Sequence, residues 1–129
     1  MATKIINIPI FKYGMAEHKR FTIPKNAIEK NLKKFVSKPI FDFNEERNPD
    51  GMATAIGYIS KVNSIGDLYV YGDIVLMDDI YSQVKPVFKN YEVSKLDWQD
   101  VDGEEYKVVN SFVLNSVSFI FEPKTKEEI

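Results

Sequence analysis

Two serines near the C-terminal end of the chain could support nucleophilic chemistry. Ser116 and Ser118 lie in the stretch LNSVSFIF, and residues at i and i+2 of a strand share one face. A serine hydroxyl becomes a nucleophile when a general base within hydrogen-bonding reach takes its proton. Alternation alone predicts a simpler arrangement, in which both hydroxyls line a polar face while Asn115, Val117 and Phe119 point the other way.

The general base that such a serine needs is scarce in this sequence. His18 is the single histidine and lies among charged neighbours, a setting typical of a solvated surface residue. The chain has no cysteine, which excludes disulfides, thiolate metal sites and a cysteine nucleophile. We therefore expect neither a metal nor another cofactor.

Acidic side chains are concentrated in the segment LDWQDVDGEEY. They are Asp97, Asp100, Asp102, Glu104 and Glu105. A calcium loop needs acids or amides at alternate positions before a glycine and a glutamate at a fixed later spacing. Here Trp98 stands at the first ligand position and the later glutamate is missing. The segment is therefore more typical of a solvated hairpin tip, turning at Asp102-Gly103.

Tyr69 and Tyr71 lie on one face of a predicted strand and could stack the bases of single-stranded nucleic acid. Such platforms accompany a basic groove, whereas the neighbours of this pair include Asp67 and Asp73. The net charge is −2, from 17 basic and 19 acidic side chains. We therefore expect neither nucleic acid nor a membrane as a partner, and assign the two tyrosines to cross-strand packing.

The length of 129 residues predicts a single domain, 1–129, with a charged end at 123–129 that we expect to fray. No apolar run is long enough for a signal peptide or a membrane span. We therefore expect a soluble protein that is made in a cytoplasm.

Apolar alternation predicts strands at 4–12, 37–43, 52–62 and 67–77 and a β region at 93–121. Residues 63–66 are expected to turn a hairpin, and 106–121 to form one long strand or two shorter ones. Within 67–77 the predicted inner face consists of Leu68, Val70, Gly72, Ile74 and Leu76.

Two helices are predicted between these strands. The apolar face of the first consists of Ala27, Ile28, Leu32, Phe35 and Val36. Asp78 and Asp79 could cap a second, which would end or kink at Pro86. The order of elements predicts an α+β fold, with a mostly antiparallel sheet or small β-barrel and two helices.

Three stretches match motifs of a known family. AIEKNLKKFVSKPIFDFN resembles a helix followed by a "K-P-[VI]" strand that leads into a catalytic histidine. AIGYISKVNSIGDLYVYGDI resembles a hairpin of the form "iG-x-[IV]…g-L-[YW]-V-x-[GA]-x-[IV]", and NSVSFIF resembles an "S-[IV]-G-F" strand that carries a nucleophilic serine. Across 22–121 the chain thus resembles the prohead (capsid maturation) protease family of tailed phages, whose barrel fold is shared with the herpesvirus assembly proteases.

The resemblance implies positions for the catalytic residues of that family. Ser116 takes the place of the nucleophile, Ser118 stands where the family has glycine, and Asn44 falls at or near the place of the histidine. An asparagine amide has no basic lone pair and does not titrate, so Asn44 cannot serve as a general base. His18 lies upstream of the helix and cannot fill that place. The resemblance therefore implies a prohead-protease-like fold that is catalytically degenerate.

The expected function is that of a non-enzymatic phage structural protein, located in the virion and taking part in head assembly. Its expected partners are other virion proteins at the capsid or portal vertex, together with copies of itself in a symmetric assembly. The candidate binding anchors are Tyr69, Tyr71, Tyr81 and Trp98. Two alternatives stay open: an active serine peptidase using Ser116 with His18 or an acidic partner, and a phage-encoded inhibitor of a host factor.

Overall fold

The computed structural model describes residues 2–15, 21–43, 55–100 and 107–123. Its elements in chain order are β1 (Thr3–Lys12), β2 (Gly14–Met15), β3 (Phe21–Ile23), α1 (Lys25–Phe35), β4 (Pro39–Asp42), β5 (Ala55–Ile65), β6 (Tyr69–Leu76), the 3-10 helix η1 (Asp79–Gln83), β7 (Val84–Asp100) and β8 (Lys107–Pro123).

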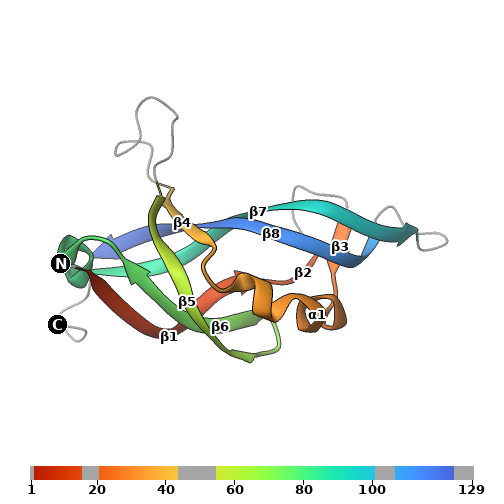
Figure 1. Ribbon diagram of the computed structural model, residues 1–129, viewed down its shortest axis with the longest axis horizontal. Coiled ribbons are helices and arrows are strands. Elements are labelled where there is room, and N and C mark those ends of the chain that lie inside the picture. Colours follow the sequence, from red (N-terminus) through yellow and green to blue (C-terminus); the bar gives the residue numbers. More distant parts are fainter. Residues whose placement is uncertain (1, 16–20, 44–54, 101–106, 124–129) are drawn as a thin grey trace.

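The strands form one mixed sheet that curls into a half-barrel (Figure 1). β1, β6 and β5 follow one another as antiparallel neighbours and are called the wall below. β7 and β8 form a long antiparallel hairpin that runs along the molecule, called the long hairpin below. β4 joins the two parts, because it pairs with β5 on one side and with β8 on the other.

The predicted α+β fold with two helices is wrong, because the described residues are mostly β and contain one α-helix. The second predicted helix is instead the short η1, followed at Val84 by a strand of 17 residues. Pro86 lacks an N–H, and Val84 and Val87 are β-branched, so this stretch suits an edge strand better than a helix. The sheet is barrel-like, but β3 and β4 pair with β8 in parallel.

The other predicted elements lie close to their expected positions. β1, β4, β5 and β6 overlap the four strands predicted from alternation, and α1 overlaps the first helix. The turn lies at 66–68 rather than at the predicted 63–66, because β5 continues through Ile65. Residues 107–123 form one strand rather than two. Asp102-Gly103 lies outside the described residues, although β7 and β8 on either side pair as a hairpin.

α1 packs against β8 and β5 with only part of its predicted apolar face. The buried members of that face are Ala27, Ile28 and Phe35. Leu32 is half-buried, and Val36, at the C-cap, is 40% exposed. Ser37 follows with a φ of 74°, the left-handed conformation in which many helices end. Among the described residues no helix is long and apolar enough to span a membrane.

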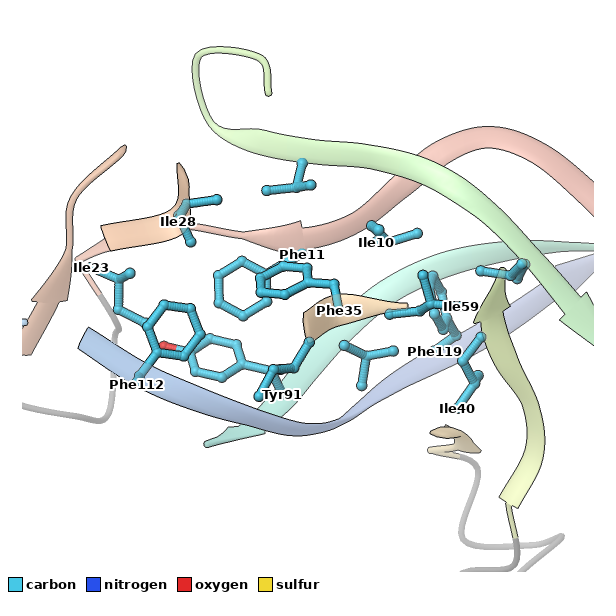
Figure 2. Close-up of a cluster of buried hydrophobic side chains, with 14 of the residues drawn as sticks. Ile10, Phe11, Ile23, Ile28, Phe35, Ile40, Ile59, Tyr91, Phe112 and Phe119 are labelled. Atoms are coloured by element: carbon cyan, nitrogen blue, oxygen red, sulfur yellow. The ribbon is translucent and has the colours of Figure 1, made fainter. Parts of the chain in front are cut away.

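The core contains a cluster of aromatic rings from both parts of the sheet (Figure 2). Phe11 of β1 has its ring centroid 4.7 Å from that of Tyr91 on β7 and 6.0 Å from that of Phe112 on β8. Its ring also lies 5.3 Å from that of Phe35 on α1. The strand pairings of β1 and β7 are with β6 and β8, so side chains rather than a β-ladder join these two strands within the described chain.

The predicted inner face of β6 is confirmed from Val70 to Leu76, since Val70, Gly72, Ile74 and Leu76 are buried. Leu68 precedes the strand and is 57% exposed. Gly72 is required by a close approach: a Cβ there would lie 2.4 Å from the carbonyl oxygen of Lys61 and 2.7 Å from Cδ1 of Ile10. At Gly72, therefore, β6 lies so close to its neighbouring strands that no side chain fits there.

The long hairpin contains β-bulges, in which one strand has an extra residue and the alternation of its side chains changes phase. The pairs Glu92–Ser116 and Val93–Leu114 leave Asn115 as the extra residue of β8. Val117 and Phe119 are buried, whereas Asn115 is exposed. The expectation that these three residues share one face is therefore wrong for Asn115, because the bulge there separates it from Val117 and Phe119.

Candidate functional site

Ser116, the serine in the place of the nucleophile, lies on β8 beside the bulge at Asn115. Its side chain is 8% exposed, and its partner across the ladder is Glu92 of β7. The hydroxyl of Ser94 donates a hydrogen bond of 3.1 Å to Oδ1 of Asn115. Among the described residues no side-chain hydrogen bond joins Ser116 to an imidazole or a carboxylate. Glu92 therefore stands opposite this serine in the ladder, but no side-chain hydrogen bond between the two is described.

The strand that leads towards Asn44 is a direct neighbour of the strand that carries Ser116. β4 pairs with β8 through Ile40–Val117 and Asp42–Phe119, and the N–H of Phe43 donates to the carbonyl of Phe119 at 2.9 Å. Because the two strands are parallel, the described chain runs past the level of Ser116 before it reaches Phe43. Asn44 and His18 themselves lie outside the described residues.

Comparisons with protein-family models, with curated proteins and with solved structures find no match to this chain. Any functional conclusion therefore depends on the residues themselves.

The four aromatic candidates occupy different surroundings. Tyr81 is 8% exposed and packs its ring 4.8 Å from that of Phe121, as a core residue does. Tyr69 and Tyr71 are half-buried and meet edge to face, with centroids 6.5 Å apart. Trp98, near the end of β7, is 46% exposed. It is the member of the four with the largest exposed fraction.

Trp98 belongs to a region that we call the hairpin tip, formed by residues 97–100 of β7 and Lys107 of β8. This region lies at one end of the molecule (Figure 1). The Nζ atom of Lys107 lies over the indole ring of Trp98, 4.6 Å from its centroid. A cation at this distance is attracted to the ring and helps to hold its orientation. The indole is thus both held and accessible.

Asp73 of β6 is a buried carboxylate to which the sequence analysis gave no role of its own. It accepts hydrogen bonds from the N–H of Asn7 at 2.9 Å and from Nδ2 of Asn63 at 2.8 Å. These two bonds, with the nearby charges of Lys4 and Lys61, lower the pKa of Asp73 in spite of its burial. Since Asn7 and Asn63 stand at bulges of β1 and β5, the carboxylate joins two irregular points of the wall.

A groove of about 330 Å³ lies between the end of α1 and β5. It is lined by Leu32, Lys33, Val36 and residues 60–65. The apolar members Leu32 and Val36 are those left uncovered at the end of the helix. The lining includes two lysines, Lys33 and Lys61, and no acidic residue. The groove therefore combines an apolar surface with positive charge.

Sequence reasoning missed this groove although part of its signal was present. Val36 extends the apolar face of the helix beyond its last turn, and no predicted strand was expected to cover it. The groove residues of β5 could not be predicted, because the bulges in β5 interrupt the alternation that would show which side chains face the helix. Among the described residues there is no cluster of histidine, aspartate and glutamate side chains that could hold a metal ion.

Proposed function

We propose that this protein is a non-enzymatic phage structural protein that binds other virion proteins at the capsid or portal vertex. The phage setting comes from the sequence resemblance to prohead proteases. The observation that carries the binding role is the exposure of Trp98 at the end of the long hairpin. Tryptophan is among the residues that most often dominate binding energy at protein interfaces.

The surroundings of Trp98 support a role in binding more than a role in folding. Its ring is 46% exposed, whereas Phe11, Phe35, Phe112 and Phe119 of the core are at most 2% exposed. Holding such a ring in place before a partner arrives reduces the entropy that is lost on binding. Lys107 provides this restraint through its position over the indole.

The non-enzymatic part of the proposal is supported by the surroundings of Ser116. An active serine needs a base within hydrogen-bonding distance, and among the described residues no side-chain hydrogen bond joins Ser116 to a carboxylate or an imidazole, although Glu92 stands opposite it in the ladder. A fluorophosphonate probe tests this directly. We expect no labelling, and labelling that disappears in Ser116→Ala would establish the alternative of an active serine peptidase.

The phage role is tested by asking whether the protein is present in purified particles. We expect it in virions, and we expect Trp98→Ala to reduce its incorporation while Met77→Ala does not. Met77 is a suitable control because it is 64% exposed but lies outside the hairpin tip. Absence from virions, together with capture of a host protein from lysate, would favour the alternative of an inhibitor of a host factor.

A further inference from the structure

Lysines are concentrated on the outer side of α1 and just after it. Residues 30–41 contain four lysines and no aspartate or glutamate. Lys30, Lys33 and Lys34 are exposed on the helix, and the half-buried Lys38 follows it. These four residues are called the lysine face below. Among the residues that the structure describes, no ion pair joins any of the four to an acidic side chain.

The elements that pack against α1 add little negative charge to this region. α1 contacts β8 and β5. The one charged residue of β5 is Lys61, and the charged residues of β8 are Lys107 and Glu122. Glu122 pairs with Lys85 at the end of β8 that lies opposite α1 in Figure 1. Within the described part of the chain, the lysine face is therefore a region of net positive charge.

This concentration of charge is hidden in the total. The net charge of −2 comes from 17 basic and 19 acidic side chains. Without the lysine face, the rest of the chain has 13 basic and 19 acidic side chains, a net charge of −6. The expectation that nucleic acid is not a partner rested on the total charge, which averages this face with a much more acidic remainder.

The stability of the helix does not explain the arrangement. The helix dipole favours Lys33 and Lys34, because both stand in the last turn. It does not account for Lys30 or Lys38. Lys30 stands three and four residues before the other two lysines of the helix, and like charges at these spacings are neighbours that destabilise a helix. A surface that serves solubility alone intersperses both signs of charge, which this face does not do.

The residue types of the face fit a phosphate backbone better than a protein or a membrane. Protein interfaces are enriched in arginine and aromatic residues and depleted in lysine, whereas interfaces with DNA are polar and strongly positive. The lysine face has neither arginine nor an aromatic residue. A helix that lies on a membrane inserts large apolar side chains, but Phe35 is fully buried and Val36 is the one large apolar residue of this region that is exposed.

We propose that the lysine face binds the phosphate backbone of double-stranded nucleic acid, whatever its base sequence. A duplex has a higher density of phosphate charge than a single strand, and the face has no exposed ring on which unpaired bases could stack. At about 1.5 Å per residue, Lys30 and Lys34 stand about 6 Å apart along the helix axis, close to two phosphate steps of about 3.4 Å on one strand. This inference goes beyond the protein-binding role proposed above and does not depend on it.

Binding is measured on the full chain by fluorescence anisotropy with a labelled DNA duplex, over a range of salt concentrations. We expect a Kd of about 10⁻⁴–10⁻⁶ M at physiological salt, the range of sequence-independent binding. The logarithm of the association constant should fall with the logarithm of salt concentration by about 0.9 for each phosphate contact, so four lysines set a limit of about 3.6. Two duplexes of unrelated sequence should bind equally, because phosphate contacts carry no sequence information.

The variant that tests the face is Lys30→Gln/Lys33→Gln/Lys34→Gln. It should bind the duplex about tenfold or more weakly at low salt, and the salt dependence should decrease by about 2.7, which corresponds to three contacts. The variant should fold at least as well as the wild type, because it removes like charges from neighbouring helix positions. Lost binding is therefore separable from lost folding.

The matched control is Lys85→Gln/Lys89→Gln/Lys95→Gln. It removes the same three charges from exposed positions of β7 and should leave most of the binding intact. The inference is overturned if the wild-type chain does not bind the duplex at low salt, if the β7 variant weakens binding as much as the α1 variant, or if one duplex sequence is strongly preferred.

Competition experiments distinguish the duplex from other polyanions. Polyglutamate and vesicles of anionic lipid should displace the duplex poorly at equal concentration of charge. Efficient displacement by either would overturn the inference in favour of an acidic protein or a membrane. Trp98→Ala should leave duplex binding unchanged, so a failure of this inference leaves the binding of virion proteins in place, and absence of the protein from virions leaves duplex binding in place.

Discussion

The wall and the long hairpin both bend by means of β-bulges, but they hold those bulges in different ways. In the wall, the N–H of Asn7 and the amide of Asn63 are bound by one buried carboxylate, that of Asp73. In β7 the irregular positions include Lys89 and Lys95, which are exposed. A bulge that is tied internally fixes the curvature of a core, whereas a bulge that carries an exposed lysine discourages a foreign strand from pairing with an edge.

This difference indicates that the wall mainly stabilises the fold, whereas the end of the long hairpin is available for contact with a partner. In the wall, glycines occupy positions where the neighbouring strands leave no room for a Cβ, and the carboxylate of Asp73 accepts two hydrogen bonds. The end of the long hairpin contains an accessible indole and exposed charged side chains. Substitutions in the wall should therefore change the free energy of unfolding, and substitutions at the hairpin tip should change binding.

The largest expected effect is on the core ring that joins the two parts. Phe11→Ala removes a fully buried side chain in contact with several other rings and should destabilise the fold by about 4 kcal/mol. Trp98→Ala should cost less than about 1 kcal/mol, because its ring is half-exposed. Urea unfolding of both variants measures the difference, and equal losses would contradict the division between wall and tip.

A smaller but still large effect is expected at the close approach in the wall. Gly72→Ala places a Cβ 2.4 Å from the carbonyl oxygen of Lys61 and should cost about 3 kcal/mol. At Gly66 the nearest atom to a new Cβ is the ring edge of Tyr71, at 2.9 Å, which can move. Gly66→Ala is therefore the matched control, with an expected loss of less than about 1 kcal/mol. Thermal or urea unfolding that ranks Gly66→Ala as the more damaging change would contradict this account.

The carboxylate that joins the bulges should make the stability of the wall dependent on pH. The pKa of Asp73 is lower in the folded chain than its ordinary value, so its contribution is fully present above about pH 4. This contribution is lost as the pH falls through the folded pKa, when the carboxylate becomes protonated. Asp73→Asn should remove it, so the wild type and the variant should approach each other in stability as the pH falls below 4.

Asp67→Asn provides the control for this comparison, because it makes the same change of charge at an exposed turn position. Urea midpoints measured between pH 3 and pH 7 distinguish the two positions. An equal gap between wild type and Asp73→Asn at every pH would show that the charge of Asp73 is not what stabilises the bulges.

The smallest expected effect compares two bulge residues in the left-handed conformation. Asn7 in the wall has a φ of 53° and Lys95 in β7 has a φ of 51°. Asparagine tolerates this region better than lysine does, and glycine best of all. Lys95→Gly should stabilise the chain by about 0.5 kcal/mol, whereas Asn7→Gly should be close to neutral. Careful urea titrations resolve differences in unfolding free energy of this size. Stabilisation by Asn7→Gly but not by Lys95→Gly would contradict the view that lysine tolerates this conformation less well than asparagine.

The success of sequence reasoning followed the regularity of each strand. β6 has no extra residue of its own, and its inner face from Val70 to Leu76 was predicted correctly. β8 has bulges, and the faces of Asn115, Val117 and Phe119 were predicted wrongly for that reason. A period of two cannot reveal the point at which the period is interrupted.

The second helix failed for a related reason. Val84, Val87 and Phe88 have the spacing of a helical face, but β-branched residues around Pro86 form the start of β7 instead. The candidate residues were predicted only in part. Trp98 was named from its residue type, but its exposure and its lysine neighbour require the ladder that brings Lys107 opposite Asp100.

The position of β8 in the sheet has a consequence for the order of folding. β8 pairs with β7, β4 and β3, yet it is the last described strand to leave the ribosome. β4 pairs with β5 and β3 pairs with β2, but each gains its second neighbour only when β8 is present, through Ile40–Val117 and Phe21–Lys107. Contacts between residues so distant in sequence are formed slowly, because closing long loops costs entropy before any contact is gained. A nascent chain that stops before Lys107 would hold β3, β4 and α1 without the one strand that all three contact, and would remain a target for chaperones until β8 emerges.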